Sequence, residues 1–163
     1  MLTRPFAAAL MLAGSLISLQ PAFAAPTPQP VAAADGIVRL KSANSFDDTV
    51  VRLKADVAAK GIRLFDQIDQ SGLGAQADLK IGRSTLVIFG NPPLGVQFLQ
   101  SNPYAGLDWP VRMLVTQDAD GAVWVAWSEF DFIAKRYRID DKPAQFKMAG
   151  EVAASIASAA TGN

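Results

Sequence analysis

The side chains that could act as a general acid or base in this chain are carboxylates, lysines and tyrosines, because its 163 residues include no histidine and no cysteine. Thiolate nucleophiles, Ser–His–Asp triads, structural zinc sites and disulfide frameworks are therefore excluded. Any acid–base catalyst would need a displaced pKa, since histidine alone titrates near neutrality unaided. The chain contains no phosphate-binding or dinucleotide-binding glycine motif and no metal-ligand spacing, so we predict neither a cofactor nor a metal.

Asp66 is the carboxylate whose position is hardest to explain by solvent exposure. It lies in the segment Ile62–Asp69 (IRLFDQID), where strand alternation groups it with three apolar side chains on one face. A carboxylate there would have a raised pKa or a basic partner such as Arg39 or Arg112. A β-bulge that returns Asp66 to solvent is the structural alternative.

Asp69 and Tyr137 complete the candidate catalytic residues. Asp69 closes the same segment as Asp66, and Tyr137 lies in the short basic run Lys135–Arg138. An enzyme that uses Asp66 or Asp69 with an arginine or Tyr137 is our alternative to a binding function. It rests on one unusually placed aspartate and on analogy with enzymes of the same fold class.

The sequence Gly90-Asn91-Pro92-Pro93 ends an apolar strand and begins a short helix. Exposed N–H groups at a helix N-terminus bind anions, so Gly90, Asn91 and Pro92 are candidate binding residues. The structural alternative is that Gly90 makes the turn, Asn91 caps the helix with its side chain and Pro92 takes the first helical position. We favour it because the two prolines remove two of the free donors.

The elements that position these residues follow from hydrophobic periodicity. Five strands and two long helices are predicted, together with short inserted helices, in the order β-α-β-β-β-β-α. Consecutive strands late in the chain indicate an α+β fold with a mostly antiparallel sheet and both long helices on one face. The predicted strands are Gly36–Lys41, Ile62–Asp69, Thr85–Phe89, Trp109–Gln117 and Ala122–Ser128. The first long helix begins after Ser45 and ends near Lys60, and the second begins at Pro143 and ends near Ala160.

The strands Thr85–Phe89 and Ala122–Ser128 are apolar on both faces, and Trp124 and Trp127 point to opposite sides of the second. Because the long helices cover one face, the other must meet a partner subunit, the inserted segment Pro92–Asp108 or a ligand. We predict a homodimer formed through this face, with a small apolar ligand as an alternative occupant near Trp124 or Trp127. The 15 basic and 15 acidic residues argue against nucleic acid as a partner.

The N-terminal residues have the pattern of a secretory signal peptide. Arg4 is the only charge before Asp35, the apolar stretch Phe6–Leu19 follows, and Ala22-Phe23-Ala24 forms an A-x-A cleavage site. The 14-residue stretch is shorter than the roughly 20 residues of a membrane span, which disfavours an uncleaved anchor. We predict a signal peptide over 1–24, a disordered Pro/Ala-rich lead-in over 25–35 and one domain over 36–160, in a periplasmic or secreted protein that leaves the membrane after cleavage.

The run Thr85–Pro92 (TLVIFGNP), together with Leu107-Asp108-Trp109-Pro110 and the opening Gly36–Leu53, resembles the domain of unknown function 302 family. The resemblance implies a β-α-β4-α fold of the TATA-binding-protein-like type, a homodimer and no established activity. The chain carries Gln70 and Tyr137 near positions where members often have histidine. Any histidine-dependent chemistry of such members is therefore closed to this chain.

Overall fold

The computed structural model describes residues 30–163. The predicted signal peptide and the first part of the predicted lead-in lie outside the described residues. The rest of the predicted lead-in, from Pro30, includes a short strand. Strand β1 (Val31–Ala32) pairs antiparallel with β2 (Ile37–Lys41), because Gly36 at φ +72° lets the chain turn back between them.

The described chain forms one six-stranded sheet in the order β1-β2-β6-β5-β4-β3, and all five strand pairs are antiparallel. The predicted antiparallel α+β fold is confirmed. Strand β5 lies at the middle of the five longer strands. Their bounds are Ile37–Lys41 for β2, Arg63–Asp69 for β3, Ser84–Gly90 for β4, Val111–Gln117 for β5 and Val123–Ser128 for β6.

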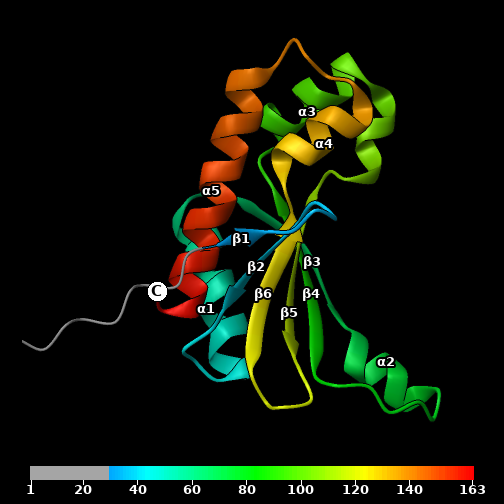
Figure 1. The fold of residues 1–163 in the computed structure, drawn as a ribbon, viewed down its shortest axis with the longest axis vertical. Helices are drawn as coiled ribbons and strands as arrows, with labels where there is room; N and C mark the ends of the chain where they lie inside the picture. The colour runs from blue at the N-terminus through cyan, green and yellow to red at the C-terminus, as the bar shows by residue number, and fades with distance from the viewer. Residues whose placement is uncertain (1–29) are drawn as a thin grey trace, which may run out of the picture.

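Both long helices pack on one face of the sheet, as predicted (Figure 1). Helix α1 (Phe46–Ala59) begins at Ser45, whose side chain accepts a hydrogen bond from the N–H of Asp48 at 3.2 Å. Helix α5 (Pro143–Thr161) packs beside it. One face of α5, with apolar residues at helical spacing, is buried throughout: Phe146, Ala149, Ala153, Ile156 and Ala160.

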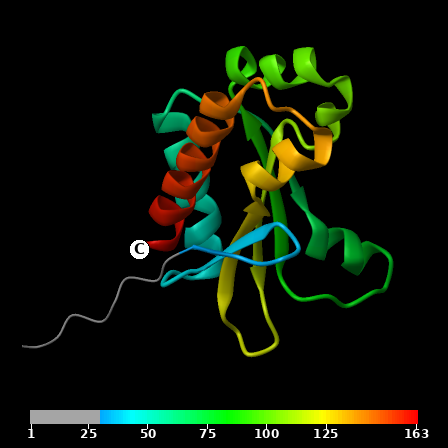
Figure 2. The ribbon, with the colours of Figure 1, turned by 45° about the horizontal axis from the view of Figure 1, so that its top comes forward.

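The hydrophobic core fills the space between these helices and the sheet. Alternate residues of the central strands point into it, and Val87, Met113, Val115 and Val125 are completely buried. The residues between them point to the opposite face, which carries no helix along its middle within residues 30–163 (Figure 2). We call this surface the open face.

In the described part of the chain, four short helices lie near the ends of the sheet: α2 (Gln70–Gln76), α3 (Pro92–Ser101), the 3₁₀ helix η1 (Pro103–Leu107) and α4 (Phe130–Tyr137). Phe98 of α3 stacks on Phe146 of α5 with ring centroids 4.2 Å apart. The inserted segment 92–108 therefore packs against α5 and the end of the sheet and leaves the middle of the open face uncovered. Between Pro30 and Asn163, none of the helices has both the length and the apolarity of a membrane span.

Candidate functional site

The open face has an apolar middle row that runs across the sheet. Strand pairing places Ile68 beside Leu86, Leu86 beside Leu114, and Leu114 beside Ala126. The row ends at Arg39 of β2, which pairs with Ala126. The four apolar side chains are half-buried by one another although nothing in the described chain covers them.

Mixed rows flank the apolar row on both sides. One contains Asp66, Ile88 and Arg112 with Ser128 and Ile37, and the other contains Ser84, Thr116, Trp124 and Lys41. Between them the surface is hollowed by about 350 Å³. The hollow is lined by Ile37, Arg39, Leu114, Thr116, Trp124 and Ala126.

Trp124 and Trp127 lie on opposite faces of β6, as the alternation predicted. Trp124 is half-buried on the open face, and its Nε1 donates a hydrogen bond to Asp118 Oδ2 at 2.9 Å. This bond is the largest cause that lowers the pKa of Asp118. Trp127 is 5% exposed and belongs to the core. Only Trp124 is thus available to a partner on the open face.

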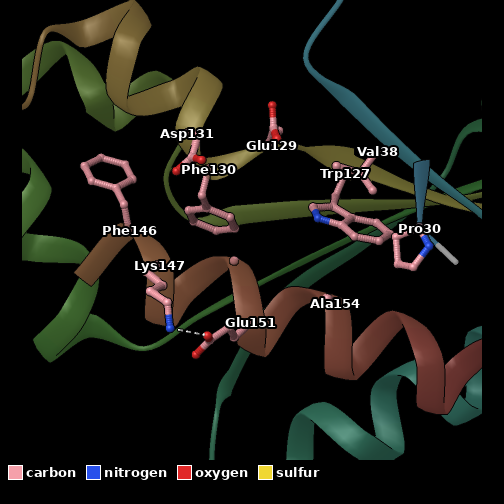
Figure 3. Close-up of a pocket in the computed structure, with 11 residues that line it drawn as sticks. Pro30, Val38, Trp127, Glu129, Phe130, Asp131, Phe146, Lys147, Glu151 and Ala154 are labelled. Atoms are coloured by element: carbon pink, nitrogen blue, oxygen red, sulfur yellow. Dashed lines mark hydrogen bonds and ion pairs between the residues drawn. The ribbon is translucent and has the colours of Figure 1, made fainter. Parts of the chain in front are cut away.

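A second hollow, of about 490 Å³, lies between the end of β6 and α5 (Figure 3). Trp127, Phe130 and Phe146 form part of its floor, and all three rings are buried. Glu129 and Asp131 lie on its rim, where Lys147 donates to Glu151 at 2.7 Å. Pro30 forms one wall of this hollow.

The turn at Gly90-Asn91-Pro92 does not have the predicted side-chain cap. Asn91 occupies the N-cap position of α3, but its side chain makes no capping hydrogen bond. Pro93 at the second helical position has no N–H, and the N–H of Leu94 donates to the backbone oxygen of Asn91 at 3.1 Å. Of the two backbone N–H groups that a capping side chain would bind, one is therefore missing, at Pro93, and the other, at Leu94, is already bonded.

Gly90 serves close packing around Trp109. A Cβ built on Gly90 would lie 3.3 Å from Nε1 of Trp109, and one on Gly95 of α3 would lie 1.8 Å from Cε2 of the same ring. The Phe65 ring meets the indole edge-on, with centroids 6.2 Å apart. The turn thus holds an indole against two glycines, which is a structural role.

Asp66 reaches the open face through a β-bulge, the alternative that the sequence left open. The register of β3 against β4 shifts between Leu64 and Asp66, so that Leu64 and Ile68 no longer share a face. Asp66 is exposed, and its Oδ1 accepts the N–H of Gln67. Neither proposed basic partner reaches it, because Arg39 pairs with Asp35 and Arg112 pairs with Asp108.

Asp69, a candidate catalytic residue, is the N-cap of α2. Its Oδ1 accepts the N–H of Gly72 at 2.9 Å, and the hydrogen bonds from Gly72 and then Ser71 lower its pKa. A lowered pKa is the opposite of what a general acid at neutral pH requires. Tyr137 is not its partner, since the Tyr137 hydroxyl donates to Asp108.

Asp108 is the centre of a charged cluster that the sequence did not reveal. Its side chain is 7% exposed, and it accepts hydrogen bonds from Tyr137 Oη at 2.6 Å, Arg112 Nη2 at 2.7 Å and Arg136 Nη1 at 3.2 Å. Burial, and then the bond to Asp108, raises the pKa of Tyr137 above its ordinary value near 10.0. Arg112 lies four residues after Asp108, whereas Arg136 and Tyr137 of α4 lie 28 and 29 residues after it, and no local motif joins them.

The arrangement supports contact more readily than catalysis. Asp66, Asp69 and Tyr137 lie in three different environments and do not converge. Among residues 30–163, no three His, Cys, Asp or Glu side chains are grouped closely enough to hold a metal ion. The open face, with its apolar row and the hollow beside Trp124, is the feature without a partner in the described part of the chain.

The family model for the domain of unknown function DUF302 matches residues 38–161. Two curated relatives are each 31% identical over 104 residues, or 64% of this chain: the fluoride-specific ion channel FluC 1 of Brucella suis biovar 1 (strain 1330) and FluC 1 of Brucella abortus biovar 1 (strain 9-941). The match covers 41% and 38% of their lengths, so the chain spans about two-fifths of each. The crystal structure of an uncharacterized conserved DUF302 protein from Bacillus stearothermophilus aligns with a TM-score of 0.64 at 15% identity, covering 79% of this chain and 98% of that one.

Proposed function

This chain belongs to the DUF302 family, a family defined by a domain of unknown function, and we propose that it is an exported, non-enzymatic binding module that forms a homodimer through its open face. The uncovered apolar row Ile68–Leu86–Leu114–Ala126 carries this proposal. Contiguous apolar patches are uncommon on soluble monomers and tend to mark contact surfaces. A symmetric pair of identical subunits is the commonest way to cover such a patch.

The open face favours a second copy of the chain over a small molecule as its main occupant. Its apolar side chains extend over four strands, from Ile68 on β3 to Ala126 on β6. A small apolar ligand would fill only the hollow of about 350 Å³ beside Trp124. Native mass spectrometry of protein purified from its own host measures subunit number and any retained ligand together.

A carboxylate-based enzyme receives no support from the side-chain geometry. Asp66 is exposed and bonded to its own neighbour, and Asp69 is engaged at a helix N-terminus. The fluoride conduction named for the curated relatives is not part of our proposal, because the chain spans about two-fifths of their length.

Export is proposed from the signal-peptide pattern of residues 1–24. Intact-mass analysis of protein from the extracytoplasmic fraction should find a chain that begins at Ala25. A species that retains Met1 would contradict it.

Sedimentation velocity tests the homodimer. Wild-type protein should sediment as a dimer, and Trp124→Glu should yield folded monomers, because the dimer would have to desolvate a carboxylate whose cost the neighbouring Lys41 offsets only in part. Trp127→Glu should unfold the protein, since Trp127 is 5% exposed in the core.

Because Trp124 also holds the β5–β6 turn through Asp118, Ala126→Glu provides a second variant that makes no such bond. Wild-type protein that is monomeric at micromolar concentration, or folded dimers of both Trp124→Glu and Ala126→Glu, would overturn the proposal.

A further inference from the structure

The two halves of the open face differ in side-chain size. On one side of the central strand β5, strand β6 contributes the small residues Ala126 and Ser128. On the other side, β4 contributes the larger Leu86 and Ile88 at the corresponding levels. The hollow of about 350 Å³ lies over the β2–β6–β5 half. At these two levels the β6 side is therefore a trough and the β4 side a ridge. At the level of Thr116 the sizes are reversed, because the large Trp124 lies on β6 and the small Ser84 on β4, so large and small residues oppose each other across β5 at every level.

A face-to-face dimer of identical sheets has its two-fold axis in the plane between them, and two directions are distinct. An axis perpendicular to the strands places each strand over its own copy, so that ridge meets ridge and trough meets trough. An axis parallel to the strands exchanges the halves, so that each ridge enters the trough of the other copy. Close packing favours the second arrangement.

From this self-complementarity we propose that the two-fold axis of the dimer runs parallel to β5, with strands β2 and β6 of each subunit lying over strands β3 and β4 of the other. The inference rests on the proposed homodimer and adds its geometry. Ala126 of one subunit then faces Leu86 of the partner subunit, because both pair with Leu114 and lie at the same level of the sheet.

The charges on the open face agree with this axis. Arg39 lies at the β2 end of the apolar row, and Ile68 lies at the β3 end. The parallel axis places Arg39 over Ile68 of the partner subunit, with Asp66 of the partner subunit two residues along the strand, or about 7 Å away. The perpendicular axis instead places Arg39, together with its ion-pair partner Asp35, over its own copy and brings no additional carboxylate near it.

The area of the face is sufficient for such a contact. Five strands about 4.8 Å apart, each rising about 3.3 Å per residue, give a face of roughly 24 Å by 20 Å, or about 500 Å². Two copies would bury roughly 1,000 Å², which is the minimum for a biological interface with good complementarity and below the roughly 1,200–2,000 Å² of stable specific complexes.

Cross-linking tests the axis directly, because the native chain contains no cysteine. Packed sheets lie about 10 Å apart, beyond the reach of a disulfide, so a short bismaleimide that spans about 10 Å is the reagent. Ala126→Cys protein mixed with Leu86→Cys protein should give a heterotypic product, while neither variant alone should cross-link. Leu114→Cys lies near the axis in both arrangements and should cross-link to itself, which serves as the control.

A size exchange provides an independent test. Ala126→Leu fills the trough and should raise the dimer dissociation constant at least tenfold, and adding Leu86→Ala in the same chain should restore it to within a few-fold. Val51→Leu, at an exposed position on α1 on the opposite side, is the matched control and should have no effect.

The outcomes separate the axis from the dimer itself. Homotypic products from Ala126→Cys, or no rescue by Leu86→Ala, would overturn the axis while the dimer stands. A monomeric wild type would overturn the proposed function as well. A dimer in which Leu114→Cys does not cross-link would show that another surface, such as the free edge of β3, forms the contact.

Discussion

Replacing Gly95 with alanine is expected to destabilise the protein because the added methyl group would overlap the Trp109 ring. Its Cβ would lie 1.8 Å from Cε2, 1.9 Å from Nε1 and 2.3 Å from Cζ2 of the indole. The indole has little room to move, since Gly90 and Phe65 border it on other sides. Either α3 or the ring must therefore shift.

The change in the free energy of unfolding combines the cost of the steric overlap with the gain from replacing glycine by alanine in a helix. Overpacking a well-filled core costs about 1–3 kcal/mol, and displacing a partly buried indole adds part of the roughly 3–5 kcal/mol that its removal would cost. Alanine gains about 1 kcal/mol over glycine in a helix. The net destabilisation is about 2–4 kcal/mol, which corresponds to a melting temperature lower by roughly 6–12 °C.

Thermal unfolding followed by far-ultraviolet circular dichroism measures the effect, with Gly150→Ala as the matched control. Gly150 lies within α5, and its added Cβ would make an ordinary contact at 3.8 Å with Phe130 Cβ. That substitution should stabilise the protein by about 0.5–1 kcal/mol. A Gly95→Ala variant that melts at or above the wild-type temperature would refute the packing role assigned to this turn.

Three further predictions concern polar groups. Asn91→Ala should change the melting temperature by no more than about 2 °C, because Asn91 makes no side-chain cap, whereas loss of a true cap would cost about 1 kcal/mol. Asp108→Asn should lower the free energy of unfolding, measured by urea titration, by about 2 kcal/mol, because the amide makes weaker bonds to two half-exposed arginines. Asp66→Asn, at an exposed position, is the control and should leave the free energy of unfolding unchanged. Equal effects of the two substitutions would contradict the stabilising role of the Asp108 cluster. Because the pKa of Tyr137 is raised in the folded state, its hydroxyl adds stability that is complete below pH 10 and is lost as the pH rises through the raised pKa. The stability difference between wild type and Tyr137→Phe should therefore shrink above pH 10, and a constant difference would count against the assignment.

The sequence by itself determined the elements and their order, because these depend on local periodicity. The stripe Phe46, Val50, Leu53 and Val57 defined α1, and all four side chains are buried. The Ser45 cap and the Asp-Gly turn between β5 and β6 formed as their local chemistry requires, with Gly121 at φ +83°. Alternation also placed Trp124 and Trp127 on opposite faces.

Only the tertiary structure decided which residues meet. The bulge before Asp66 changes the face of every later residue of β3, and it arises from pairing with β4, not from a local signal. Arg136 and Tyr137 reach Asp108 from 28 and 29 residues away along the chain. Hydrogen bonds of that kind depend on the approach of distant backbones, which periodicity along one chain does not encode. Alternation along single strands predicted that the open face carries apolar residues. Which large and small residues lie side by side on that face depends on which strands are neighbours, and only the strand order gives this.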